Sequence, residues 1–179
     1  MHNDIEQILF TQEQISARVK ELGKQLSEEY KDKHPVFICI LKGSSLFFAD
    51  LVREINVPLT FDFMSISSYG SGTVSSGEVK LIKDLDHSIE NRHVVVVEDI
   101  VDTGHTLTYL IKNLKARMPA SVKICTLLNK ECRREACVSP EYIGFEVDNY
   151  FVVGYGLDYD EDYRHLPYVG VLKPEVYTK

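Results

Sequence analysis

The fold is decided by the stretch VVVVEDIVDTGHTL, which runs from Val94 to Leu107. Its four consecutive valines are typical of a strand that is buried on both faces, as in parallel sheets. The chain then passes Glu98 and Asp99, enters the turn Asp102-Thr103-Gly104 and continues into a helix expected over about 105–117. Because the N–H groups at a helix N-terminus attract anions, this turn predicts an anion-binding site at the carboxyl end of a central strand.

The flanking sequence continues this alternation of strands and helices. Apolar or alternating runs predict strands at 36–41, 59–67, 93–97 and 122–128, and several short strands between 142 and 172. Apolar residues three or four positions apart predict an amphipathic helix over 5–30 and another over 46–55. The pattern indicates an α/β fold, a mainly parallel twisted sheet flanked by helices, whose ligands bind beyond the carboxyl ends of the strands.

Length and composition predict a single domain, 1–179, because 179 residues can bury a core without disulfides or metals. The four cysteines form no CxxC pair, so we expect reduced thiols. No apolar run approaches the roughly 20 residues that span a bilayer, and the N-terminus lacks the features of a signal peptide. Together with a net charge of −7, this predicts a cytoplasmic protein that binds neither membrane nor nucleic acid.

The acidic residues of the first stretch restrict the ligand. Helix capping explains one acid but not three, and a plain phosphate site would exclude carboxylates. The ligand must therefore offer a phosphate together with hydroxyls or divalent cations, as 5-phosphoribosyl 1-diphosphate (PRPP) does. The N–H groups of residues 102–106 and the hydroxyls of Thr103 and Thr106 can hold its 5-phosphate, while Glu98 and Asp99 bind the ribose and help to orient Mg²⁺.

The stretch resembles the PRPP-binding motif of the type I phosphoribosyltransferases. Four further matches are similar to the hypoxanthine-guanine branch of that family: LKGSS at 41–45, SSYG at 67–70, LLNK at 127–130 and FVVGYGLDYDEDYR at 151–164. The resemblance implies the type I phosphoribosyltransferase fold with a small hood built from the N-terminal and C-terminal segments. It also implies a mobile active-site lid at about 67–83 with Ser68 and Tyr69 at its tip, in agreement with the Gly and Ser content of 70–77.

The resemblance assigns a role to each matching position. PRPP and its 5-phosphate are implied to bind Glu98, Asp99, Asp102, Thr103, Gly104, His105 and Thr106. The pyrophosphate group is implied to bind Lys42, Gly43 and Arg164, with a cis peptide bond before Lys42. The purine is implied to contact Lys130, Phe151, Val152 and Asp158, and Mg²⁺ to contact Glu98, Asp99 and Asp158.

The implied reaction is purine salvage: Mg²⁺-dependent transfer of the phosphoribosyl group from PRPP to a 6-oxopurine, hypoxanthine or guanine, which gives IMP or GMP and pyrophosphate. Asp102 is the implied general base at purine N7, and Lys130 the implied donor to the oxygen at C6. The family commonly forms a homodimer or homotetramer. His105 and Tyr150 depart from common family usage, which leaves phosphate affinity and base preference open.

Two alternatives remain beside this interpretation. One is a transferase that prefers xanthine, since base choice depends on few contacts. The other is a PRPP-binding regulator, which would normally need a basic face or a further binding domain. A dinucleotide-binding dehydrogenase is discarded because no GxGxxG follows any expected strand.

Overall fold

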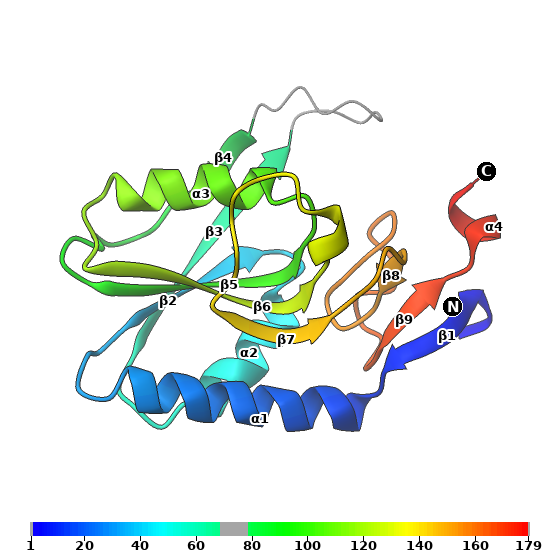
Figure 1. Cartoon of the computed structure of the whole chain (residues 1–179), viewed down its shortest axis with the longest axis horizontal. Coiled ribbons are helices and arrows are strands. Elements are labelled where there is room, and N and C mark those ends of the chain that lie inside the picture. Colours follow the sequence, from blue (N-terminus) through cyan, green and yellow to red (C-terminus); the bar gives the residue numbers. More distant parts are fainter. Residues whose placement is uncertain (1, 69–78, 179) are drawn as a thin grey trace.

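The computed structural model describes residues 2–68 and 79–178, and a six-stranded sheet forms its centre (Figure 1). The strands follow the order β4-β3-β2-β5-β6-β7, and only β3 and β4 run antiparallel. Their bounds are β2 Val36–Leu41, β3 Thr60–Ser68, β4 Val79–Lys83, β5 His93–Val101, β6 Ser121–Asn129 and β7 Tyr142–Glu146. This mostly parallel sheet confirms the predicted fold class.

Helices cover both faces of this sheet. Helices α1 (Gln12–Glu29) and α2 (Ser45–Arg53) lie on one face, and α3 (His105–Lys115) lies on the other (Figure 1). Alternate side chains of each central strand enter separate cores, because successive residues of a strand point to opposite faces. In β5, Val95 and Val97 pack with α1 and α2, whereas Val94 and Val96 pack with α3.

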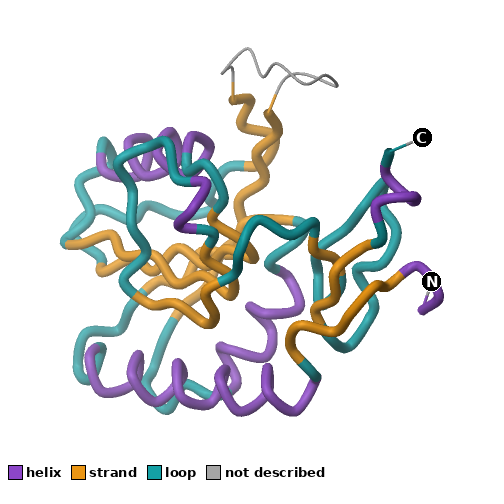
Figure 2. The backbone as a smooth tube through the Cα atoms, turned by 45° about the vertical axis from the view of Figure 1, so that its right-hand side comes forward, coloured by secondary structure: helices purple, strands orange, loops and turns teal. Residues whose placement is uncertain are grey.

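A second, three-stranded antiparallel sheet lies beside the first (Figure 2). It joins β1 (Ile5–Phe10), β9 (Val169–Leu172) and β8 (Val152–Val153). The short helix α4 (Pro174–Tyr177) follows β9, and 3-10 turns cover His2–Asp4 and Glu131–Arg133. This small sheet thus combines segments near both ends of the chain.

The expectation that the first helix starts at Ile5 is wrong. Residues 5–10 form β1, and α1 begins only after the N-cap Thr11, whose side chain accepts a hydrogen bond from Gln14 N. The partner of β1 is β9, with Ile5 opposite Leu172. Strand formation here depends on a partner more than 150 residues away, which local periodicity cannot reveal.

Strand β5 extends further than the predicted 93–97. Its pairing with β6 continues until Val101 lies opposite Asn129, so Glu98 and Asp99 belong to the strand itself. Adjacent residues in a strand point to opposite faces, and the two carboxylates therefore diverge.

The predicted lid falls mainly outside the described residues. Ser68 is the last residue of β3, and Tyr69 lies in the range 69–78 that the structure does not describe. Cys39, Cys125, Cys132 and Cys137 are all free thiols, the first two buried in strands. Within the described part of the chain, no helix has both the length and the apolar character that crossing a membrane requires.

Candidate active site

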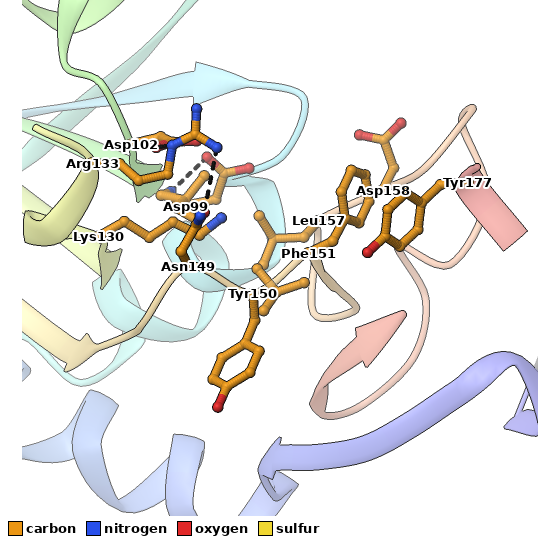
Figure 3. A pocket seen from close by; sticks show the side chains of 12 residues that line it. Asp99, Asp102, Lys130, Arg133, Asn149, Tyr150, Phe151, Leu157, Asp158 and Tyr177 are labelled. Carbon is orange, nitrogen blue, oxygen red and sulfur yellow. Dashed lines mark hydrogen bonds and ion pairs between the residues drawn. The ribbon is translucent and has the colours of Figure 1, made fainter. Parts of the chain in front are cut away.

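Two cavities open where β5 ends. The large cavity, of about 500 Å³, is lined by Asp99, Ile100, Asp102, Lys130, Arg133, Asn149, Tyr150, Phe151, Val152, Leu157, Asp158 and Tyr177 (Figure 3). The small cavity, of about 120 Å³, is lined by Glu98, Ile100, Val101, Asp102, Thr103, Gly104, Thr106 and Leu107. Ile100 and Asp102 line both, so the two cavities share a wall.

The small cavity is built from the turn between β5 and α3. Gly104 is the N-cap of α3 and has a φ of 86°, in the left-handed region that favours glycine. A Cβ at this position would lie 2.7 Å from Val138 Cγ1, so the turn also needs the absence of a side chain. Thr103 and Thr106 flank Gly104 around the cavity, where their hydroxyls join the N–H groups at the helix N-terminus. The arrangement suits a phosphate group.

His105 is the one residue of the predicted phosphate set that lines neither cavity. Its Nε2 atom lies 2.8 Å from Glu135 Oε2, and both side chains are exposed. His105 can therefore reach a ligand in the small cavity only through its backbone N–H, at the first turn of α3.

The two adjacent acids, Glu98 and Asp99, line different cavities. Glu98 lines the small cavity and Asp99 the large one, as their opposite orientations in β5 require. Burial raises the pKa of Glu98 well above its usual range, and the neighbouring Asp99 raises it further. Burial also raises the pKa of Asp99 to about 6, partly offset by the hydrogen bond that its Oδ1 accepts from Ile100 N at 2.7 Å. Both side chains lack an ion-pair partner among the described residues.

These unpaired carboxylates fit a divalent cation. Mg²⁺ is usually held by one or two carboxylates together with phosphate oxygens and water, and Glu98 and Asp99 supply such oxygens at two sides of the shared wall. No group of three or more acidic, His or Cys side chains that could hold a metal occurs in the described residues. The residues therefore suit a cation that arrives with a phosphorylated ligand better than a cage made by protein alone.

Asp102 lines both cavities and pairs with Arg133. Arg133 Nε lies 3.2 Å from Asp102 Oδ1 as an ion pair (Figure 3), and this buried oxygen accepts no hydrogen bond from the described residues. This oxygen can therefore accept a hydrogen bond from a ligand N–H.

The backbone on either side of Asp102 is held by Arg134. Its guanidinium donates hydrogen bonds to the carbonyl oxygens of Val101, Asp102 and Val138, at 3.2, 3.0 and 2.6 Å. Asn129, at the end of β6, accepts a further hydrogen bond from Arg134 and donates to both oxygens of Glu146. This network connects the turn to β6 and β7.

All four predicted purine-contacting residues line the large cavity. Lys130 is only 6% exposed, and burial lowers its pKa. Val152 belongs to β8 and is buried. Phe151 and Asp158 lie on the side of the cavity opposite Lys130 (Figure 3).

The sequence did not single out several residues of the large cavity. Arg133 and Asn149 are within 3.3 Å of each other, and the ring of Tyr177 stacks on Phe151 with centroids 4.6 Å apart and planes inclined by 17°. The basic pair Arg133-Arg134, two residues after the LLNK motif, was a usable signal. Nothing near Tyr177 in the sequence indicates its position, because β9 and α4 return it to the cavity from the other end of the chain.

Of the three residues predicted for pyrophosphate, Gly43 lies against Asp99 and Arg164 pairs with Asp158, whereas Lys42 pairs with Glu161. The Leu41–Lys42 peptide bond is cis, as the resemblance implied. A Cβ on Gly43 would lie 1.7 Å from Asp99 Oδ2, and a Cβ on Gly156 would lie 1.9 Å from the Gly43 carbonyl oxygen. These two glycines let the turn after β2, strand β5 and the loop after β8 approach one another closely.

Arg164 completes this group. Its Nη2 lies 2.9 Å from Asp158 Oδ1, its Nη1 donates to the Gly156 carbonyl oxygen at 2.8 Å, and its charge lowers the pKa of Asp99.

Comparison with known proteins agrees with this geometry. Residues 6–160 match the model of the phosphoribosyl transferase domain. The hypoxanthine-guanine phosphoribosyltransferase of Bacillus subtilis is 54% identical over 177 residues, which cover 99% of this chain and 98% of that protein. A crystal structure of a hypoxanthine phosphoribosyltransferase from Staphylococcus aureus has a TM-score of 0.97 and 50% identity, and covers 100% of this chain and 97% of that one.

The chain also matches part of a longer protein. It is 50% identical over 179 residues to the bifunctional protein TilS/HprT of Listeria innocua, and it spans 28% of the length of that relative. The domain model matches most of this chain, and the relatives of similar length align with nearly all of it. The chain therefore belongs to the phosphoribosyltransferase family, in its hypoxanthine-guanine branch.

Proposed function

We propose that this protein transfers the 5-phosphoribosyl group of PRPP to hypoxanthine or guanine, forming IMP or GMP and pyrophosphate. One observation carries the proposal: Asp102, which has a buried oxygen that accepts no hydrogen bond from the described residues, forms the wall shared by a phosphate-sized cavity and a larger one. A ribose that bridges the two would have its C1 atom beside this carboxylate. The relatives named hypoxanthine-guanine phosphoribosyltransferase support the same substrates.

The small cavity would bind the 5-phosphate. Thr103 and Thr106 donate their hydroxyls, the N–H groups of residues 102–106 add further donors, and the positive end of α3 stabilises the charge. Glu98 and Asp99 accept hydrogen bonds from the ribose hydroxyls.

The large cavity would bind the purine. Phe151 offers an aromatic face for stacking, and the backbone of Val152 reads the edge of the base together with Asp158. Lys130 donates a hydrogen bond to the oxygen at C6. An amino group at C6 would set two donors against each other, so adenine should be refused.

The reaction would proceed through a ribose that gains positive charge at C1 as pyrophosphate leaves. Lys42, Gly43 and Arg164 bind the departing pyrophosphate, N9 of the purine attacks C1, and Asp102 accepts the proton from N7. Glu98 and Asp99 would help to orient Mg²⁺ beside the ribose, and Asp158 would hold a second Mg²⁺ beside the pyrophosphate, where the cations would neutralise charge on the phosphate oxygens. Asp158 now pairs with Arg164, so it must exchange that partner to take this role.

We also propose that the whole chain acts as one domain. The segment 67–83, with Ser68 and Tyr69, would close over the bound ligands to exclude water. The protein would form a homodimer or homotetramer.

The decisive experiment measures initial rates with PRPP, Mg²⁺ and each of hypoxanthine, guanine, xanthine and adenine. IMP should form from hypoxanthine and GMP from guanine, with no product from adenine. Rates highest with xanthine would change the base assignment to a xanthine-preferring transferase. Binding of PRPP without any nucleotide product would instead favour the PRPP-binding regulator.

A further inference from the structure

Glu161 contacts both cations that we assign to pyrophosphate. Its Oε2 atom lies 2.9 Å from Lys42 Nζ and 3.6 Å from Arg164 Nη2. Lys42 and Arg164 come from different parts of the fold, the turn after β2 and the loop after β8, and this single oxygen bridges them. The pair of Lys42 and Glu161 is exposed, with side-chain exposures of 68% and 66%.

The backbone around Glu161 directs the carboxylate to this position. Glu161 and Tyr163 have φ values of 66° and 75°, in the left-handed region that residues other than glycine, asparagine and aspartate rarely adopt, and the preceding Asp160 has a φ of 52°. The Glu161 N–H donates to Asp158 Oδ2 at 3.0 Å, and Tyr159 and Asp162 bond each other's backbone. Unfavourable conformations of this kind persist where the surrounding structure imposes them, often near functional sites.

We propose that Glu161 is an internal substitute for pyrophosphate: its carboxylate bridges Lys42 and Arg164 in the free protein and must leave before the diphosphate of PRPP can bind. The inference rests on the proposed function, because it takes these two residues as the pyrophosphate-binding cations. Carboxylate and phosphate oxygens accept from the same donors, so the two anions exclude each other.

The competition should be mild. Ion pairs between exposed side chains are weak, and pyrophosphate carries several negative charges against one on Glu161. Displacing the carboxylate therefore lowers affinity for PRPP and pyrophosphate without preventing binding. As pyrophosphate leaves, the Glu161 carboxylate returns to Lys42 and Arg164, which favours product release.

The test replaces Glu161 by Gln in the full chain and measures the dissociation constant of magnesium pyrophosphate by calorimetry. Glu161→Gln keeps the size of the side chain and removes its charge, so affinity should rise by about two- to fivefold. The KM for PRPP should fall to a similar degree. This gain is opposite to what loss of a structural or ligand-binding residue would produce.

Asp160→Asn is the matched control. It removes the same charge from the same loop, and Asp160 forms no ion pair with Lys42 or Arg164 among the described residues. The affinity of the Asp160→Asn variant for pyrophosphate should stay within the error of the wild-type value. An equal gain in Asp160→Asn would assign the effect to net charge and overturn the inference.

Two other outcomes separate this inference from the proposed function. If the wild type binds pyrophosphate and Glu161→Gln binds equally or more weakly, Glu161 is no competitor, while the pyrophosphate site stands. If Arg164→Gln binds pyrophosphate as well as the wild type does, the cation assignment itself fails, and the inference fails with it.

Discussion

The small and large cavities differ in how the chain builds them. The small cavity comes from one continuous segment, 98–107, in which a strand, a turn and a helix start follow one another. The large cavity draws on four separate segments, from Asp99 near the middle of the chain to Tyr177 near its end. The first is therefore specified by local geometry and the second by tertiary structure, so changes in the two should have separable effects.

Asp102 belongs to both cavities, and its replacement should have the largest effect. Asp102→Asn keeps the shape of the wall but removes the proton acceptor. We expect kcat for IMP formation to fall about 100-fold or more, the usual contribution of a general base, while the KM for PRPP changes less than about threefold. Steady-state kinetics with both substrates measures this split.

A suitable control for Asp102→Asn is Glu21→Gln, which removes an exposed carboxylate paired with Arg18 on α1. It should leave both constants unchanged. Normal turnover in Asp102→Asn would remove Asp102 from the role of general base.

Lys130 belongs to the large cavity alone. Lys130→Met retains the apolar stem and removes the buried donor, so kcat/KM for hypoxanthine should fall about 10- to 100-fold, the range of a hydrogen bond from a charged group. The affinity for PRPP, measured without base, should not change. An equal loss of kcat/KM for hypoxanthine and of affinity for PRPP would mean that Lys130 maintains the structure of both cavities instead of binding the base. Lys115→Met, at the exposed end of α3, provides the control.

The contrast between the cavities also explains what the sequence could predict. The turn at 102–106 was predictable because a buried strand, acidic residues, glycine and a helix are adjacent in the chain. Even there the length of β5 was underestimated, since its last residues are held by pairing with β6. Arg133 had a local signal in its basic pair with Arg134, whereas the positions of Asn149 and Tyr177 depend on contacts between distant segments that no local pattern encodes. The same reason accounts for β1, which requires β9 as its partner.

Replacing Asp99, which lies on β5 and lines the large cavity, should change the stability of the protein in a pH-dependent way. The pKa of Asp99, about 6 in the folded protein, exceeds the ordinary value, so the folded state binds its proton more tightly than the unfolded state does. The ionised carboxylate therefore destabilises the ligand-free protein above pH 6, and this cost disappears as the pH falls toward 4. Asp99→Asn, which also removes a charge beside Glu98, should raise the free energy of unfolding by about 1–2 kcal/mol at pH 8 and by much less at pH 4.

Urea denaturation in metal-free buffer at both pH values measures the effect of Asp99→Asn. Asp160→Asn, on an exposed loop residue, should change stability little at either pH. A variant that is less stable than the wild type at pH 8 would show that the stronger hydrogen bond that an ionised carboxylate accepts from Ile100 N outweighs the cost of burying the charge.

The smallest expected effect concerns Tyr177, whose ring stacks on Phe151 at the edge of the large cavity. Stacked aromatic pairs contribute about 0.5–1.5 kcal/mol beyond the area that they bury, so Tyr177→Ala should raise the KM for hypoxanthine about two- to fivefold by loosening Phe151. The KM for PRPP should not change, because Tyr177 does not line the small cavity. Tyr109→Ala, an exposed tyrosine on α3, is the matched control. A change in both KM values would mean that the two cavities are coupled through the small sheet, and that the separation between them is incomplete.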